Sequence, residues 1–262
     1  MEEAICFEHV SYRYNEESDW ALQDVSVTIQ RGEQTAIIGE NGAGKSTFAK
    51  LCCGLLNSEH GTVTIDSKEI YPLKNKEKAS LIGYVFQNPD DQIFLSTVEK
   101  EISYPHKDYP DKEFFHEVVS LCQLENHLDS HPYNLPWSTR KFITIASIIL
   151  QKPTYIIFDE PTAGQEKKGK EILKNILSYL NNQQTTVLMI SHDMEFIAEN
   201  FKRALVLKET KVIADDSTKR IFYNEELLQS SGLDQPFVPK LLSSLYSVDS
   251  EVLTMDDLAK EL

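Results

Sequence analysis

The order of apolar and polar residues predicts strands near the N-terminus. Ile5 and Phe7 alternate with polar neighbours, and the apolar residues of 25–29 and of 62–65 do the same. A period of two is typical of strands with one face buried and the other in water. We expect the first two segments to belong to an antiparallel layer and the third to be a further strand of this kind.

Three other segments, at 34–38, 155–158 and 186–190, are largely apolar without alternation. Short apolar runs of this kind indicate strands that are buried on both faces. An amphipathic helix separates the last two segments, and its apolar face carries Ile172, Leu173, Ile176, Leu177 and Leu180. Apolar strands joined by amphipathic helices predict a parallel sheet covered on both faces.

The remaining pattern predicts helices and a hairpin. The segment 51–56 continues a helix, and 204–207 with 211–214 predict a closing hairpin. The tail from about residue 217 is acidic, and we expect Pro236 and Pro239 to break its helices. A middle region rich in aromatic and acidic residues has helical spacing at Phe114, Val118, Leu121 and Cys122.

Composition and charge exclude several classes of function. The chain has 262 residues, with 26 Lys and Arg against 41 Asp and Glu, a net charge of -15. Phosphate backbones select basic surfaces, so nucleic acid is not an expected partner. No apolar run approaches the ~20 residues of a membrane span, and the first residues do not resemble a signal peptide. We therefore expect a cytosolic protein that works at a membrane only through partners.

The cysteines predict a reducing compartment. They form no C-x-x-C pair and no metal-ligand spacing with histidine, so we interpret them as small buried side chains with free thiols. They are Cys6, Cys52, Cys53 and Cys122.

A glycine-rich loop follows the apolar segment 34–38. Residues 39–46 read Gly-Glu-Asn-Gly-Ala-Gly-Lys-Ser and fit the P-loop pattern G-x-x-x-x-G-K-[ST] between a strand and a helix. Backbone N–H groups of such a loop surround phosphate oxygens, the lysine reaches the β- and γ-phosphates, and the serine hydroxyl ligates Mg²⁺. The predicted ATP site comprises Gly39, Glu40, Asn41, Gly42, Ala43, Gly44, Lys45, Ser46 and Thr47.

Two carboxylates follow the apolar segment 155–158. Asp159 and Glu160 stand at the carboxyl end of this predicted strand, where open α/β sheets place ligands. We predict that Asp159 holds the metal, directly or through water, and that Glu160 orients and polarises the attacking water. An Asp-Glu pair at a strand end is usually a solvated turn, and the upstream P-loop is what favours the catalytic interpretation.

These motifs, in this order, resemble the ATP-binding-cassette (ABC) proteins. His192 follows the segment 186–190 as their switch histidine does, residues 83–89 resemble their glutamine loop, and Tyr14 lies where they stack an aromatic ring on adenine. Two narrower stretches look like the ATPase subunits of energy-coupling-factor transporters, which import vitamins and transition-metal ions. These stretches are residues 87–94 and 231–237.

The resemblance covers about residues 4–240 and implies roles for three side chains. Gln87 would reach Mg²⁺ and the attacking water, and its loop would sense a membrane subunit; a loop cap is the alternative. His192 would donate to the γ-phosphate, with a structural histidine as the alternative. Tyr14 would offer a π-face to adenine. Because Tyr12 is two residues away, a place for Tyr14 in the core is its alternative.

The Leu-Ser-Gly-Gly-Gln signature of the family is altered here. Aligned without a gap, residues 135–139 read Leu-Pro-Trp-Ser-Thr. Pro136 removes a serine hydroxyl and a backbone N–H, and Trp137 replaces a glycine that permits close approach. We expect phosphate recognition by this segment to be impaired, while Ser138 or Thr139 can still N-cap the following helix.

The loop after the predicted base departs from the family too. Residues 163–166 read Ala-Gly-Gln-Glu, so Glu166 replaces an interfacial aspartate. One interpretation is a chain that is losing function altogether. Retention of the residues that touch this chain's own nucleotide argues against it: Lys45, Asp159, Glu160 and His192.

The predicted fold is an α/β P-loop NTPase with a parallel sheet, an antiparallel β layer and an inserted helical subdomain, as in ABC nucleotide-binding domains. We expect that domain at 1–216, its helical subdomain at about 88–150 and an acidic helical extension at 217–262. The predicted function is binding and hydrolysis of Mg-ATP by a subunit of a membrane ABC transporter. The resemblance implies an energy-coupling-factor-type importer of a vitamin or a metal ion.

The resemblance also implies partners. They are a second ABC ATPase with an intact signature, in a nucleotide-sandwich heterodimer, and integral membrane subunits that hold the chain on the inner face of the cell membrane. One alternative is a soluble ABC ATPase outside transport, for which 262 residues leave no room for a long coiled coil, a zinc hook or tandem cassettes. Another is a regulatory subunit that holds ATP with little turnover, and the presence of Glu160 argues against it.

Overall fold

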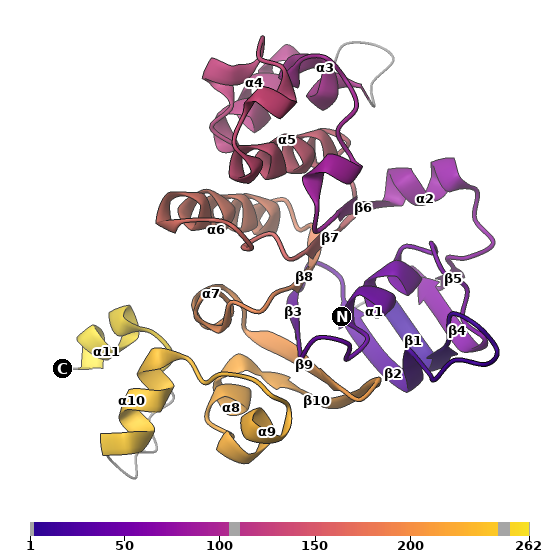
Figure 1. Ribbon diagram of the computed structural model, residues 1–262, viewed down its shortest axis with the longest axis vertical. Coiled ribbons are helices and arrows are strands. Elements are labelled where there is room, and N and C mark those ends of the chain that lie inside the picture. The colour runs from indigo at the N-terminus through magenta and orange to yellow at the C-terminus, as the bar shows by residue number, and fades with distance from the viewer. Residues whose placement is uncertain (1–2, 105–110, 246–251, 262) are drawn as a thin grey trace. The chain divides into compact units, whose positions relative to one another are not determined.

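The computed structural model describes residues 3–104, 111–245 and 252–261. Contacts group the chain into two units, Met1–Pro72 with Leu188–Leu262 and Leu73–Val187 (Figure 1). The first two residues, whose composition bore on the signal-peptide prediction, lie outside the described residues. So do residues 246–251 and 262 of the predicted C-terminal extension.

The first unit contains an antiparallel sheet in the order β2-β1-β4-β5. Phe7 of the central strand is paired with Val27 on one side and with Val63 on the other. The side chain of Phe7 is buried, and its ring stacks on that of Phe48 at 4.3 Å between centroids. The predicted antiparallel layer is confirmed. Its strands are β1 (Glu3–Tyr12), β2 (Leu22–Gln30), β4 (His60–Ile65) and β5 (Lys68–Glu69).

The same unit contains buried parallel strands. β3 (Gln34–Ile38) pairs in parallel with β9 (Arg203–Lys208), and β9 forms an antiparallel hairpin with β10 (Lys211–Ser217). Every residue of β3 after Gln34 is buried, as its apolar sequence predicts. The closing hairpin is confirmed as well.

The helix after the glycine-rich loop is shorter than predicted. α1 (Lys45–Cys52) ends four residues before Leu56. Gly54 adopts a φ of 62°, and its N–H donates to the carbonyl of Leu51 at 3.0 Å. A glycine in the left-handed conformation just past a helix is a common stop signal. Apolar residues continue beyond the helix, which is why the apolar pattern overestimates its length.

The C-terminal part of the first unit is helical. Pro236 precedes α10, but Pro239 is the third residue of that helix, so the prediction that Pro239 breaks a helix is wrong. N–H groups in a first turn have no intrahelical acceptor, and a proline there removes no hydrogen bond. The helices are α7 (Met194–Asn200), α8 (Thr218–Phe222), α9 (Glu225–Ser230), α10 (Phe237–Leu245) and α11 (Met255–Glu261).

The second unit combines two parallel strands with helices. Gly83 of β6 is paired with Ile156 of β7. α3 and α4 both pack on α5, and Figure 1 shows these three helices grouped together. The elements are α2 (Asn75–Leu81), β6 (Ile82–Val85), α3 (Val98–Ser103), α4 (Lys112–Leu121), α5 (Trp137–Leu150), β7 (Tyr155–Asp159) and α6 (Lys167–Asn182). Short 3₁₀ helices lie at Pro89–Asp91, Glu125–His127 and Pro132–Asn134.

Helix α6 and strand β8 (Thr186–Ile190) follow the sequence pattern closely. The five apolar residues predicted to line the inner face of α6 are buried, together with Gly169. All residues of β8 are buried. With buried parallel strands, an antiparallel sheet and a helical group, the predicted α/β fold class is confirmed.

The start of α5 differs from the prediction. Pro136 is its N-cap residue, with φ −53° and ψ 146°, and no side chain caps the helix. Ser138 and Thr139 lie inside the first turn, so neither is the predicted cap. Proline holds the extended conformation from which a helix starts, because its ring fixes φ.

Candidate active site

The glycine-rich loop of the first unit packs closely against the neighbouring backbone. Gly39 has a φ of 151°, and a Cβ there would lie 2.2 Å from the carbonyl oxygen of Leu207. At Gly44, with a φ of 101°, a Cβ would lie 2.5 Å from the carbonyl oxygen of Ala21. Only glycine combines such a conformation with so close an approach. The local fold therefore requires these two glycines of the predicted P-loop.

Lys45 is buried at the start of α1. Its Nζ donates to the carbonyl oxygens of Gly39 at 2.8 Å and of Glu40 at 2.9 Å. The ammonium is thus held against the loop, at a helix N-terminus whose partial positive charge also attracts anions. This arrangement suits the phosphate groups of a nucleotide.

Tyr14 lies beyond the end of β1 and is 53% exposed, so the alternative that places it in the core is wrong. Its Oη lies 3.2 Å from Oγ1 of Thr47 in the P-loop helix. Its ring meets Tyr12 edge to face, at 5.1 Å between centroids. The structure therefore brings the predicted adenine-stacking residue to the predicted phosphate loop with an exposed ring.

Arg13 fixes the loop that carries Tyr14. Its Nε and Nη2 donate to the two carboxylate oxygens of Glu59 at 2.8 and 2.7 Å. Its Nη1 donates to the carbonyl of Glu16 at 2.7 Å, and its guanidinium carbon lies 5.0 Å from the centroid of Trp20. Sequence reasoning missed this residue, because its carboxylate partner is 46 positions away.

His192 lies directly between β8 and α7. Asp193 caps α7 by accepting from the N–H of Phe196 at 3.1 Å, and its own N–H donates to Oγ of the buried Ser191 at 3.0 Å. Partial burial lowers the pKa of His192 below its ordinary value of 6.5, and the charge of Lys45 lowers it further. These surroundings disfavour the charged imidazolium, and in either protonation state a ring N–H can donate a hydrogen bond.

Asp159 ends β7 in the second unit and is 5% exposed. Its Oδ2 accepts from the Tyr84 hydroxyl at 2.7 Å. Its Oδ1 is buried, and within the described part of the chain it has no hydrogen-bond partner. Buried polar atoms are rarely left without a partner, and Mg²⁺ takes hard oxygen ligands. The carboxylate predicted to hold the metal therefore fits that role.

Glu160 is buried and has a φ of 51°, in the left-handed region that non-glycine residues rarely adopt. Its carbonyl oxygen accepts from the N–H of Ala163 at 3.3 Å and from Nζ of Lys141. Lys141 was not singled out from the sequence, because a lysine in a helix is usually exposed.

Gln87 follows β6, and its side chain is exposed. Instead, the side chain of Gln92 holds the loop by accepting from the N–H of Phe86 and donating to the carbonyl of Tyr84, both at 2.9 Å. Asn88 caps the 3₁₀ helix that follows. The described residues show no hydrogen bond from the Gln87 side chain, so the alternative of a loop cap is wrong for it.

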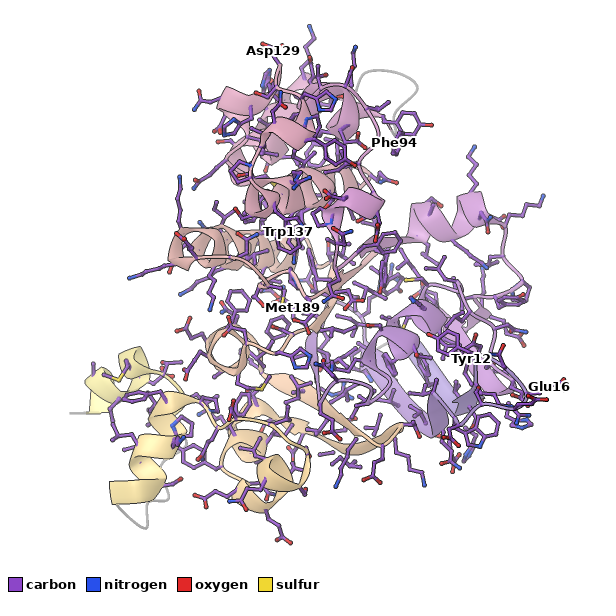
Figure 2. All side chains as sticks on the ribbon, viewed as in Figure 1. Tyr12, Glu16, Phe94, Asp129, Trp137 and Met189 are labelled. Carbon is purple, nitrogen blue, oxygen red and sulfur yellow. The ribbon has the colours of Figure 1, made fainter. Side chains whose placement is uncertain are left out.

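The altered signature segment contacts both neighbouring loops of the second unit. Trp137, labelled in Figure 2, packs its ring so close to Gly164 that a Cβ there would lie 2.6 Å from the indole. Its Nε1 donates to Oδ1 of Asn88 at 3.4 Å. The amide of Gln165 donates to the carbonyl of Ser138 at 3.0 Å. The two segments that depart from the family are therefore packed on each other.

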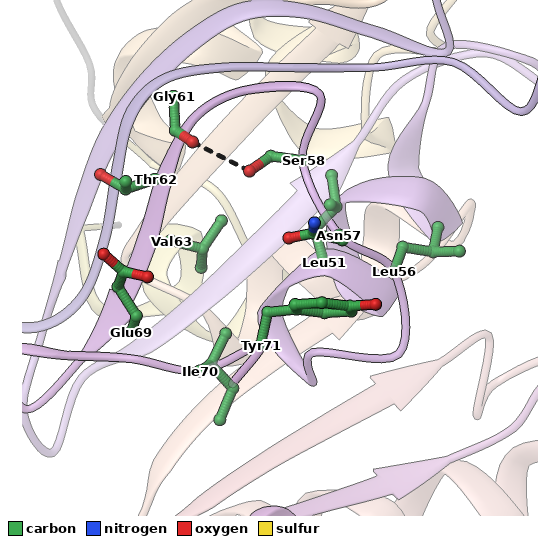
Figure 3. Close-up of a pocket in the computed structure, with 10 residues that line it drawn as sticks. All are labelled: Leu51, Leu56, Asn57, Ser58, Gly61, Thr62, Val63, Glu69, Ile70 and Tyr71. Atoms are coloured by element: carbon green, nitrogen blue, oxygen red, sulfur yellow. Dashed lines mark hydrogen bonds between the residues drawn. The ribbon is translucent and has the colours of Figure 1, made fainter. Parts of the chain in front are cut away.

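The pocket in Figure 3 is lined by residues of the first unit. Its volume of about 120 Å³ is below the range of small-molecule sites, roughly 300–1,000 Å³. None of the predicted site residues lines it, so it is not the nucleotide site. Its lining residues are Leu51, Leu56, Asn57, Ser58, Gly61, Thr62, Val63, Glu69, Ile70 and Tyr71.

The cysteines agree with the interpretation from the sequence except at Cys6, which is not fully buried. All four cysteines are free, and three of them are buried, while Cys6 is half-buried. Among the described helices, none has the length and apolar character that a membrane crossing requires.

The sequence is similar to known proteins. A family model described as ABC transporter matches residues 22–163. The chain is 34% identical to the energy-coupling factor transporter ATP-binding protein EcfA1 of Geobacillus kaustophilus, over 100% of this chain and 97% of the relative. It is 31% identical to EcfA2 of Clostridium tetani, over 99% and 96%. An ABC transporter ATP-binding protein of Enterococcus faecalis is 35% identical over 89% of this chain, but the chain spans only 42% of that relative.

Solved structures agree with the sequence relatives. CbiO1 from Clostridium perfringens, described as part of the ABC transporter complex cbiONQ, superimposes with a TM-score of 0.78 and 29% identity. This match covers 93% of the present chain and 100% of CbiO1. The dimeric cassette MJ0796 bound to ADP and phosphate gives 0.73 and 25%, over 82% of this chain and 98% of that one. The chain therefore belongs to the ABC transporter family, as an ATPase that matches energy-coupling-factor ATP-binding proteins along its whole length.

Proposed function

We propose that this chain is the catalytic ATPase subunit of an energy-coupling-factor-type importer. One observation carries the proposal. The residues that would bind this chain's own nucleotide are present in the expected motifs, whereas the signature segment at 135–139 is altered. Full-length similarity to two EcfA proteins supports the transporter type. The solved CbiO1, part of a transporter complex, supports work alongside membrane subunits.

The phosphate-binding residues divide the work on the nucleotide. Tyr14 stacks on adenine, residues 39–47 surround the phosphates, and Lys45 contacts the β- and γ-phosphates. Ser46, Gln87 and Asp159 hold Mg²⁺, and the fit of Asp159 rests on its buried Oδ1 atom without a hydrogen-bond partner among the described residues. When bound, Mg²⁺ neutralises negative charge on the phosphates.

The hydrolytic residues act on water and on the γ-phosphate. The Glu160 carboxylate accepts a hydrogen bond from the attacking water and orients it toward phosphorus. His192 donates a hydrogen bond from a ring N–H to a γ-phosphate oxygen as negative charge develops there. Water adds to phosphorus while the bond to the bridging oxygen breaks, which yields ADP and phosphate.

The altered signature points to a heterodimer. Each site in the family combines the P-loop of one subunit with the signature of the other. We propose a partner ATPase with an intact signature, because Pro136 and Trp137 cannot supply the serine hydroxyl and the close backbone approach. The domain division stays a prediction, with the nucleotide-binding domain at 1–216, its helical subdomain at about 88–150 and the extension at 217–262.

An exposed aromatic pair supports docking to a membrane subunit. Phe94 and Tyr104 are 62% and 63% exposed, and their rings meet edge to face at 5.0 Å. Phe94 lies seven residues after Gln87, and Figure 2 shows it on the helical part of the second unit. Exposed aromatic clusters mark interaction sites. Docking there would hold the chain on the cytoplasmic face of the membrane.

Two substitutions test the assignment of catalytic roles. Lys45→Ala should remove tight binding of Mg-ATP, because Lys45 contacts phosphate in the ground state. Glu160→Gln should preserve binding and stop turnover, because Glu160 acts once water attacks. Nucleotide titration and phosphate release measure the two effects, with the surface variant Lys152→Met as the control. Near-normal hydrolysis by Glu160→Gln would show that another residue is the base.

A further inference from the structure

A lysine is buried next to the proposed catalytic loop. Lys141 lies in α5 and is 1% exposed. Burying an ammonium group is costly unless other groups compensate for the lost water. Its Nζ donates to the backbone carbonyl of Glu160, and it lies 4.4 Å from the centroid of the Trp137 ring. The hydrogen bond to the Glu160 backbone therefore replaces part of the hydration that the Lys141 ammonium loses on burial.

The backbone that Lys141 contacts is strained. The φ of 51° at Glu160 belongs to the left-handed region, which is unfavourable for a residue with a Cβ atom. Such a conformation persists only where the surroundings enforce it. The Glu160 carbonyl accepts from the N–H of Ala163 at 3.3 Å and from Nζ of Lys141. Fixing this carbonyl fixes the peptide plane that follows the Cα of Glu160, and with it the backbone conformation of the residue that carries the carboxylate.

The charge of Lys141 suits the same role. Burial lowers the pKa of Lys141 to about 8, and the neighbouring carboxylates of Glu160 and Asp159 act against that decrease. The amine is therefore mostly protonated near pH 7. A charged donor makes a stronger hydrogen bond than a neutral one.

Trp137 completes the arrangement. The Lys141 ammonium lies over its ring, and the same side chain packs against Gly164 in the loop after Glu160. The amide of Gln165 adds a hydrogen bond to the carbonyl of Ser138. The start of α5 and the loop 160–165 are thus joined by packing of the Trp137 ring on Gly164 and by hydrogen bonds, while the cation–π contact between Lys141 and Trp137 lies within α5.

We infer that Lys141 is a positioning residue that holds Glu160 in its working conformation, and that Trp137 shields Lys141 from water. This inference rests on the proposed function, in which Glu160 orients the attacking water. Lys141 acts through the Glu160 backbone, so its loss should lower turnover and leave ATP binding intact. The conservative change Lys141→Arg keeps a charged donor for the same carbonyl, so it should preserve much of the turnover.

The test uses the transporter complex purified through a tag on the full chain. Lys141→Met, Lys141→Gln and Lys141→Arg are compared with Lys152→Met, whose Nζ also lies over an aromatic ring, 4.2 Å from the centroid of Phe114. We expect Lys141→Met to lower kcat by at least ~10-fold with KM for Mg-ATP within ~2-fold, because small errors in catalytic geometry are costly. Lys141→Arg should recover at least about half of kcat, and Lys152→Met should match the wild type.

The outcomes separate the inference from the proposed function. A wild-type kcat for Lys141→Met overturns the inference, as does a parallel loss of ATP affinity and kcat. If Lys141→Met does not fold, Lys141→Gln is the deciding variant, because the shorter glutamine side chain cannot reach the Glu160 carbonyl. A wild-type kcat for Lys141→Gln again overturns the inference. Wild-type turnover by Glu160→Gln contradicts the proposed function instead, whatever the Lys141 variants do.

Discussion

The Tyr84 hydroxyl donates a 2.7 Å hydrogen bond to Oδ2 of Asp159, a residue 75 positions further along the chain. Both side chains are buried, and they come from the neighbouring parallel strands β6 and β7. The bond occupies one carboxylate oxygen and leaves Oδ1 without a hydrogen-bond partner in the described structure. Tyr84 therefore orients the carboxylate so that Oδ1 is the oxygen available to a metal.

Tyr84→Phe should weaken the binding of Mg²⁺ by Asp159. Without the hydroxyl, the carboxylate is free to rotate, and loss of an outer-shell partner typically costs 10–100-fold in metal affinity. We expect the Mg²⁺ concentration for half-maximal ATPase activity to rise about 10-fold, with activity recovering at high Mg²⁺. A Mg²⁺ titration measures this, with Tyr71→Phe on the exposed Tyr71 as the control. An unchanged Mg²⁺ requirement would contradict the role given to Tyr84.

Tyr14 is predicted to contribute its ring and not its hydroxyl. Stacking on a base is worth roughly 1–3 kcal/mol, so Tyr14→Ala should weaken ATP binding by about 10-fold or more. Tyr14→Phe keeps the π-face and loses only the contact with Thr47 Oγ1, so it should bind ATP within about 2-fold of the wild type. Calorimetric titration with ATP checks both values. Equal losses in the two variants would mean that the hydroxyl, and not the ring, carries the interaction.

Much of the fold could be predicted from the sequence because the spacing of apolar residues reflects which positions of each strand and helix are buried. The strands β3 and β8 begin and end at the predicted residues. The errors lie at positions where backbone conformation decides where a helix begins or ends, and the spacing of apolar residues carries no information about backbone conformation. Gly54 ends α1 through its left-handed conformation, and Pro239 is tolerated because it lies in a first turn.

Without the family resemblance, the candidate site was predictable only where its chemistry is contiguous in sequence. Lys45, Asp159 and Glu160 stand in short motifs, so their residue types and spacing reveal them. Tyr84 and Lys141 do not, because their partners are 75 and 19 residues away and their roles arise from tertiary packing. Nothing in the sequence around Lys141 distinguishes it from an exposed lysine on a helix.

The buried Lys141 should make stability depend on pH in the alkaline range. Its pKa is about 8 in the folded protein, against an ordinary value of 10.5. Between these values the unfolded chain binds a proton that the folded chain has released, so folding stability rises with pH. Below pH 8 both states are protonated, and this contribution is constant. The free-energy cost of burying the Lys141 charge therefore lowers stability at neutral pH and disappears as pH rises from about 8 toward 10.5.

The check compares thermal unfolding of the wild type and of Lys141→Met from pH 7 to 10. The melting temperature of the wild type, relative to that of Lys141→Met, should rise as pH increases above about 8. Lys152→Met should follow the wild type over the same range. A constant difference between wild type and Lys141→Met would mean that Lys141 does not lose its proton in this window.

The last prediction is that the working assembly is an asymmetric heterodimer with one competent ATP site. This chain supplies a P-loop, both carboxylates and His192, so an intact signature from a partner completes its site. Its own signature segment would face the partner's nucleotide, and there the Trp137 ring is already packed against Gly164 and Lys141. Pro136 has no backbone N–H to offer. The partner's nucleotide therefore lies in the poorer site.

Activity measured with each catalytic glutamate replaced in turn distinguishes the two sites. Glu160→Gln should abolish most ATPase activity of the mixed complex, and the equivalent change in the partner should matter less. A homodimer would place the altered signature over both nucleotides, and loss of one transition-state donor typically costs ~10²–10³ in rate. The isolated chain should therefore hydrolyse ATP slowly. Vigorous ATPase activity of this chain alone would contradict the prediction, and so would equal effects from the two glutamates. Either result requires that residues 135–139 still serve as a working signature.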